Sequence, residues 1–145
     1  MKTITIDGKE YRIDCNAFTA IQHRKIFNRG ILNDINILND YMVTQTIVLQ
    51  KIQNENPNIS ETEMLEKVSE VMMTKIDDFI EAVTRVTYTL IYCANENIED
   101  YDTFLKGIKK FKISDKWIAE VTELAVDCFC WFRSNTRIKK NKLRE

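Results

Sequence analysis

The chain has 145 residues, a length that suits one domain. Its 44% hydrophobic and 30% charged residues are typical of a globular protein and exclude a fully disordered chain. With three glycines and one proline it is neither collagen-like nor proline-rich, and a barrel of many short strands is disfavoured. The formal net charge of −1 argues against a protein whose whole surface binds nucleic acid.

The sequence predicts no membrane span and no secretory signal. No apolar run approaches the roughly 18 residues that indicate a transmembrane helix. The N-terminal stretch carries Asp7 where a secretory signal would be hydrophobic. We therefore expect a protein of the cytoplasm, in which its four cysteines are reduced thiols.

The first 13 residues predict a β-hairpin. Residues 3–6 are β-branched throughout, and Asp7-Gly8 favours a two-residue turn because glycine tolerates a positive φ. The matching register places Ile4 opposite Tyr11 on one face. Because an isolated hairpin is marginal in water, this face must pack on the rest of the chain.

Helix signals follow the hairpin. Asn16 can cap a helix that ends at Gly30. The apolar phase of residues 33–56 slips once, which predicts either a kink or a short helix leading into a longer one, and Pro57 then breaks the chain. The apolar residues assigned to the first helix are Phe18, Ile21 and Phe27.

The next helix starts with a capping box of Ser60 and Glu63 and runs through Met72. After Thr74 we expect a long helix to about Asn95. Its residues 83–93 also suit a strand, but the longer 3.6-residue period favours a helix.

A short helix from Tyr101 and a last helix over residues 115–133 complete the prediction. The apolar arc of the last helix is about 160° wide, more than one neighbour needs. Either this helix is central in the core or part of it meets another chain, which could be a second copy. The second alternative makes its large apolar residues candidate partner contacts: Trp117, Val121, Leu124, Phe129, Trp131 and Phe132.

The predicted fold is therefore mainly α, with an N-terminal hairpin (residues 1–14) followed by a bundle of five to six helices in a single domain, residues 1–132. Residues 133–145 hold six basic and one acidic residue, while the remaining 132 residues carry a net charge of −6. This composition predicts a flexible basic tail. Arg137, Lys139 and Lys140 are its candidate contacts.

No catalytic, metal-binding or cofactor-binding residue is predicted. Phosphate-loop, dinucleotide and nucleophile-elbow motifs are absent from the sequence. The only histidine, His23, is expected to be a solvated helix residue, and the acidic pairs 77–78 and 99–100 are expected near helix starts. Cys15 and Cys93 stand alone, and the remaining pair, Cys128 and Cys130, has neither redox nor zinc-knuckle spacing, so we expect small buried hydrophobes.

The order of these pieces resembles the tail assembly chaperones of long-tailed bacteriophages and their prophages. The hairpin with Asp7-Gly8, the helical body and the segment Asn97-Ile98-Glu99-Asp100-Tyr101-Asp102-Thr103-Phe104-Leu105 carry the resemblance, which covers about residues 1–132. It implies a non-enzymatic protein of the bacterial host cytoplasm, absent from the mature virion. Its partners would be the tape measure protein and the tail tube protein.

In that family a longer form is often made by programmed frameshifting near the end of the short form. Residues 139–142 (Lys-Lys-Asn-Lys) must be encoded by A-rich codons, which fits such a site.

Other functions stay open at the level of the sequence. The basic tail could bind phosphates of a nucleic acid without reading its sequence, although it has no aromatic residue for base stacking and the acidic body would repel DNA. A small nucleic-acid-binding regulator is thus the main alternative, and a gel shift at low salt would test it. A helical toxin–antitoxin or anti-defence partner is weaker, and an enzyme is the least favoured.

Overall fold

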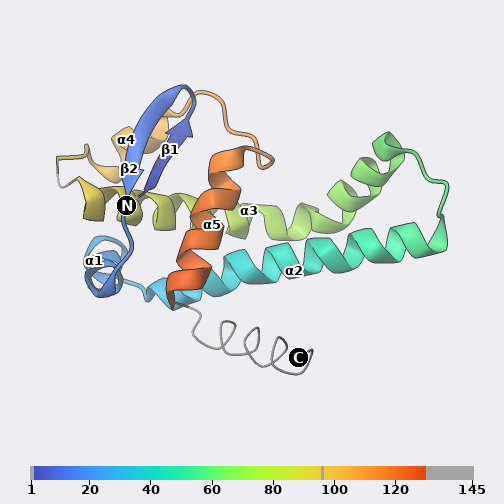
Figure 1. Ribbon diagram of the computed structural model, residues 1–145, viewed down its shortest axis with the longest axis horizontal. Coiled ribbons are helices and arrows are strands. Elements are labelled where there is room, and N and C mark those ends of the chain that lie inside the picture. Colours follow the sequence, from blue (N-terminus) through green and yellow to red (C-terminus); the bar gives the residue numbers. More distant parts are fainter. Residues whose placement is uncertain (1, 96, 130–145) are drawn as a thin grey trace, which may run out of the picture.

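The computed structural model describes residues 2–95 and 97–129. An antiparallel hairpin precedes five helices, as predicted (Figure 1). Residues 130–132, at the predicted end of the domain, and the predicted basic tail, residues 133–145, lie outside the described residues, and so does the boundary between them. The elements are β1 (Lys2–Ile6), β2 (Lys9–Ile13), α1 (Ala17–Phe27), α2 (Ile31–Glu55), α3 (Glu61–Ala94), α4 (Tyr101–Gly107) and α5 (Lys116–Phe129).

The hairpin has the predicted register. Ile4 lies opposite Tyr11, and the turn places Asp7 at φ 49° and Gly8 at φ 81°. One face of the hairpin is buried against α3 and α5, which is the packing that a two-stranded sheet needs to be stable. Its buried residues are Ile4, Ile6 and Ile13.

Replacing Gly8 by alanine is expected to lower the free energy of unfolding by about 1–2 kcal/mol, because an L side chain is strained at this positive φ. A steric clash with neighbouring residues does not contribute to this loss, since a Cβ at Gly8 would meet no atom within 4 Å. Gly107→Ala is the matched control: its Cβ would also meet nothing within 4 Å, and it ends α4 without a positive φ. Urea denaturation of both variants should show a loss for Gly8 and no loss for Gly107.

Helix α1 begins where predicted and ends earlier. The Asn16 side chain accepts a hydrogen bond from the Phe18 N–H, and the Thr19 hydroxyl accepts one from the Asn16 N–H, which completes a capping box. The helix stops at Phe27 because Asn28 adopts a left-handed conformation (φ 54°), so the predicted end at Gly30 was wrong.

The face that α1 buries is also different from the predicted one. Phe18 and Ile21 are exposed, whereas Thr19, Gln22 and His23 are buried. The apolar spacing in this helix was therefore misleading, because buried His23 forms hydrogen bonds with Asp34 on α2 and Thr89 on α3.

Two predictions about the long helices need correction. Residues 31–55 form one uninterrupted helix, α2, without the predicted division. The two helices predicted on either side of Thr74 are one helix of 34 residues, α3, whose axis bends after its first turns (Figure 1). The Ser60 hydroxyl accepts from the Glu63 N–H (3.2 Å), which is one of the two hydrogen bonds of the predicted capping box, and the strand-like residues 83–93 are helical.

The C-terminal half of α3 is the centre of the core. It packs against α1, α2, α4, α5 and β2, so apolar residues are needed on nearly every side of it. Val83, Val86, Leu90 and Ile91 have at most 1% of their surface exposed. Helix α5 crosses α2 and α3 and closes the core, with Trp117 and Val121 buried beneath it.

Candidate partner-binding surface

The predicted contact residues of the last helix divide into three groups. Trp117 and Val121 are buried, and the Trp117 ring packs edge-on against Phe111 at 5.8 Å. These two side chains fix α5 to the body. They are therefore core residues and are not available on the surface as partner contacts. Leu124 and Phe129 are half-buried. The others lie outside the described residues: Trp131, Phe132, Arg137, Lys139 and Lys140.

A different surface is apolar and uncovered. Residues 40–78, which we call the arm, comprise the C-terminal part of α2, the turn after it and the N-terminal part of α3. The arm projects as a helical hairpin beyond the region that the other elements cover (Figure 1). Six large apolar residues of the arm are exposed, each with between 39% and 67% of its surface accessible to solvent: Met42, Val43, Ile47, Leu65, Val71 and Met73.

Part of this surface is hollowed. A groove of about 480 Å³, which we call the large groove, lies between α2, α3 and the start of α5. Apolar side chains from both helices of the arm line most of it: Tyr41, Met42, Leu65, Val68, Met72, Met73 and Ile76. Uncovered apolar surface gathered in this way is typical of a protein-binding site.

The arm is also acidic. Residues 40–78 contain eight acidic and three basic residues, a net charge of −5. One pair is internal to the arm, since Lys75 Nζ lies 2.7 Å from Asp40 Oδ2 across the two helices. The surplus of carboxylates favours a partner with basic residues around an apolar stripe.

A buried polar network holds the base of the arm. Asp34 on α2 is fully buried, and Arg85 on α3 donates to both of its carboxylate oxygens (3.1 and 2.8 Å). Arg29 Nη2 lies 2.9 Å from the same carboxylate. His23 on α1 reaches Asp34 Oδ2 with Nε2 and Thr89 Oγ1 with Nδ1, both at 2.7 Å. The network therefore ties three helices together at one carboxylate.

The ionisation of Asp34 follows from this environment. Burial alone would raise the pKa of its carboxyl, but hydrogen bonds from His23 and Arg85 and the charges of Arg85 and Arg29 outweigh burial and lower the pKa. The hydrogen bonds with Asp34 in turn raise the pKa of the Arg85 guanidinium. Asp34 is thus a carboxylate at neutral pH, and His23 Nε2 must carry a hydrogen to donate to it.

His23 was expected to be solvated, and that prediction was wrong because its surface is fully buried. Neighbouring arginine and lysine in the sequence suggested a polar face, but the partners of the ring are 11 and 66 residues away. The acidic pair Asp77 and Asp78 was also misplaced: it is exposed in the middle of α3 and not near a helix start. Asp100 does precede α4 directly, as predicted.

Cys15, Cys93 and Cys128 lie close together although they are distant in sequence, but Cys15 and Cys93 are half-buried and Cys128 is exposed, so the prediction of buried cysteines was wrong for Cys128. Burial and a hydrogen bond with Cys128 raise the pKa of the Cys15 thiol, and nearby Cys93 adds to this. Burial also raises the pKa of Cys93. Raised pKa values leave these thiols protonated and weakly nucleophilic at neutral pH. Among the described residues, no group of three or more histidines, cysteines or acids could hold a metal ion.

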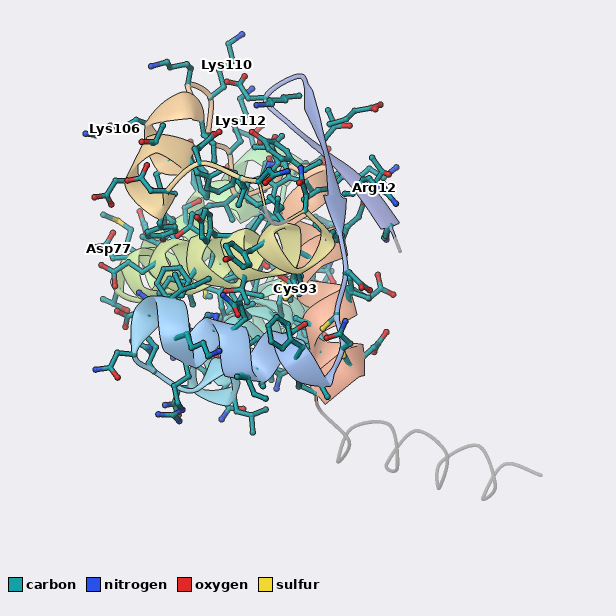
Figure 2. The ribbon with its side chains drawn as sticks, turned by 90° about the vertical axis from the view of Figure 1, so that its left-hand side faces the viewer. Arg12, Asp77, Cys93, Lys106, Lys110 and Lys112 are labelled. Atoms are coloured by element: carbon teal, nitrogen blue, oxygen red, sulfur yellow. The ribbon has the colours of Figure 1, made fainter. Side chains whose placement is uncertain are left out.

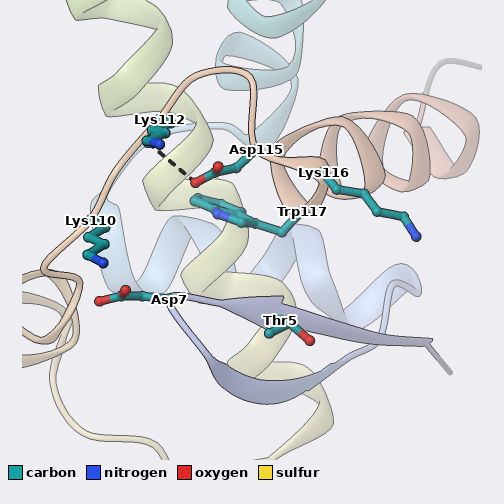
Figure 3. A pocket seen from close by; sticks show the side chains of 7 residues that line it. All are labelled: Thr5, Asp7, Lys110, Lys112, Asp115, Lys116 and Trp117. Atoms are coloured by element: carbon teal, nitrogen blue, oxygen red, sulfur yellow. Dashed lines mark hydrogen bonds between the residues drawn. The ribbon is translucent and has the colours of Figure 1, made fainter.

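A second hollow of the surface, of about 270 Å³, lies beside the hairpin turn and the start of α5 (Figure 3). It has mixed charge, with three lysines and two carboxylates in its wall. Asp7 accepts a hydrogen bond from the Lys109 N–H (2.9 Å) and Asp115 accepts one from the Lys112 N–H (3.3 Å). The first bond fastens the loop before α5 to the hairpin and the second is internal to that loop, so both are structural.

Basic side chains are found at the opposite end from the arm. Lys106, Lys110 and Lys112 lie together beside α4 (Figure 2). Because Lys110 and Lys112 share the wall of the second hollow with Asp7 and Asp115, the charge at this end is mixed, in contrast to the acidic arm.

Comparison of the chain with family models, with curated proteins and with solved structures gives no match. None of the helices in residues 2–95 and 97–129 is both long enough and apolar enough to cross a membrane.

One signal in the sequence could have revealed the arm. Its α3 portion has apolar residues at Met64, Leu65, Val68, Val71, Met72 and Met73, which cover an arc of about 200° at 100° per residue. An arc of this width is more than one neighbouring helix covers. Val68 and Met72 are buried, whereas Leu65, Val71 and Met73 are exposed.

Proposed function

We propose that this chain is a non-enzymatic chaperone that covers an apolar helical segment of another polypeptide. The observation that carries the proposal is the arm, which exposes six large apolar side chains and a groove of about 480 Å³. Exposed apolar surface of this kind lowers its free energy when a partner covers it.

The chemistry of the arm defines the partner. Its groove between two helices suits a third, amphipathic helix, whose apolar residues recur every three or four positions. Its net charge of −5 favours basic residues beside that apolar stripe. Binding would withdraw an aggregation-prone helix from other copies of itself.

The resemblance to tail assembly chaperones supports a specific version of this function. In this version the bound polypeptide is the tape measure protein of a long-tailed phage or prophage, and the chain also recruits tail tube subunits. It acts in the cytoplasm of the bacterial host before the tube polymerises and is not retained in the virion.

Co-expression with the tape measure protein tests the proposal. We expect the tape measure protein to be soluble with the wild-type chain and mainly insoluble with the double variant Leu65→Asp/Met73→Asp. Both residues line the large groove and are more than 60% exposed, so the substitutions affect binding and leave the fold intact. Each lost apolar contact at the centre of an interface costs about 1–2 kcal/mol or more.

The matched control is Ile21→Asp, which places the same charge on an exposed apolar residue of α1, outside the arm. It should keep the tape measure protein soluble. If the tape measure protein is equally soluble without this chain, or if Ile21→Asp is as damaging as the arm variant, the proposal is wrong.

A further inference from the structure

Another segment of the same sequence has the properties expected of a partner for the arm. Residues 130–145 carry six basic residues and one acidic residue, a net charge of +5, against −5 on the arm. Four large apolar residues accompany these charges in the sequence: Trp131, Phe132, Ile138 and Leu143. The segment therefore combines the two properties that the arm selects, apolar side chains and positive charge.

The point at which the described structure ends is next to the binding surface. Helix α5 ends at Phe129, and Val126 and Asp127 in its last turn line a hollow of about 240 Å³ between α5 and α2. This hollow shares Met42 and Ala119 with the large groove. The two hollows are therefore adjacent, and together they form a depressed region that extends from the last turn of α5 to the arm.

The segment is long enough to cover it. Along α2 the depression runs from Asn39 to Gln45, about 9 Å, and along α3 it runs from Leu65 to Phe79, about 21 Å. Sixteen residues span about 24 Å even in a helical conformation and about 50 Å when extended. Reach therefore imposes no limit on contact within one chain.

We propose that residues 130–145 bind to the arm of the same chain and cover its groove until a partner displaces them. The proposal rests on the arm being the binding surface of the proposed function, and it adds regulation to that surface. A partner must then compete with a resident basic segment, which excludes weakly basic or purely apolar competitors. The covered arm is also protected from self-association while no partner is present.

Zero-length carbodiimide cross-linking of the full chain tests this, because the reagent joins only a lysine amine and a carboxylate that are already in contact. We expect cross-links within one chain from Lys139, Lys140 or Lys142 to carboxylates of the arm, identified by mass spectrometry in the monomer fraction. An equal mixture of ¹⁵N-labelled and unlabelled chains separates links within a chain from links between chains. In about 1 M salt, where the Debye length is about 3 Å, the yield should fall several-fold.

Charge reversal supplies a matched pair of variants. Glu66→Lys/Glu70→Lys changes two exposed residues of the arm, and Glu10→Lys/Glu99→Lys makes the same change in net charge at exposed positions elsewhere. The first variant should lose most of the cross-links and the second should keep them, while circular dichroism confirms that both remain helical. Links that go mainly to carboxylates outside the arm, links only between chains, or no links at all would each overturn the proposal.

No partner protein is present in this experiment, so its outcome is separate from the co-expression test. An arm that shows no contact with residues 130–145 could still bind the tape measure protein. Conversely, a tape measure protein that needs no chaperone would leave the intramolecular contact in place.

Discussion

Replacing Asp34 by asparagine is expected to lower the free energy of unfolding by about 3 kcal/mol. The carboxylate is fully buried and receives hydrogen bonds or ion pairs from Arg85, Arg29 and His23. Asparagine has nearly the same shape but no charge, so the cations around it lose their counter-charge. The loss should be near the lower end of the range of about 3–5 kcal/mol for breaking a buried ion pair, because Arg29 is 36% exposed and keeps part of its hydration.

Asp40→Asn is the matched control on the same helix. Asp40 also pairs with a cation at 2.7 Å, but its side chain is 62% exposed, and surface pairs contribute about 0–1 kcal/mol. Urea denaturation followed by circular dichroism gives both values. A loss at Asp34 no larger than that at Asp40 would show that the buried network does not stabilise the fold.

The same carboxylate predicts a pH dependence. Because the folded-state pKa of Asp34 is below its ordinary value of 3.8, the unfolded chain takes up this proton first as the pH falls. The contribution of Asp34 to stability is therefore fully present well above pH 3.8 and is lost as the pH falls through the folded-state pKa. Urea denaturation below pH 5 should show a steeper loss in the wild type than in Asp34→Asn.

Replacing Phe79 by alanine is expected to cost about 3–5 kcal/mol of unfolding free energy. Phe79 is 1% exposed and stacks on Tyr41, with ring centroids 4.1 Å apart and an interplanar angle of 24°. This contact joins α3 to α2 next to the point where the arm leaves the body. Removing the ring leaves a cavity between two long helices that cannot easily close.

Met73→Ala is the control for Phe79, since Met73 is on the same helix and 67% exposed. Its effect should stay within about 0.5 kcal/mol, as for most surface substitutions. Thermal and urea unfolding of both variants measure the difference. If Phe79→Ala costs less than about 1 kcal/mol, the packing of α2 on α3 at this point cannot be tight.

These two sites suggest how the chain keeps an exposed apolar surface without losing its fold. The polar network around Asp34 and the ring stack of Phe79 both connect α2 to α3 near the base of the arm. The arm beyond them needs no further cover from the body. The six exposed apolar residues of the arm therefore add little to the stability of the monomer, whereas its buried residues Tyr41, Val68 and Met72 belong to the core.

Local signals predicted several parts of the fold correctly. The β-branched run and Asp7-Gly8 predicted the hairpin and its register because a turn type depends on few neighbouring residues. Asn16 and Ser60 marked two helix starts for the same reason. The 3.6-residue period identified the C-terminal half of α3 as a helix despite its strand-like composition.

The candidate surface was not predicted in its present place. An apolar residue in a helix is a core residue or a contact residue according to what packs against it, and Trp117 and Leu65 have equally apolar settings in the sequence. The structure buries Trp117, on the inner face of α5, and leaves Leu65 62% exposed on the arm. Periodicity cannot distinguish these cases because it reports the faces of one helix and not the neighbours of each face.

By itself the sequence determined the mainly helical class, the hairpin with its turn and the helix starts at Asn16 and Ser60, because these depend on contacts between residues a few positions apart. Only the tertiary structure decided that His23 is buried against Asp34, that α3 is continuous through Thr74, and that the arm projects without cover. Each of these depends on partners tens of residues away. Burial and charge pairing are properties of the neighbours in space, and these are set only when the helices pack together.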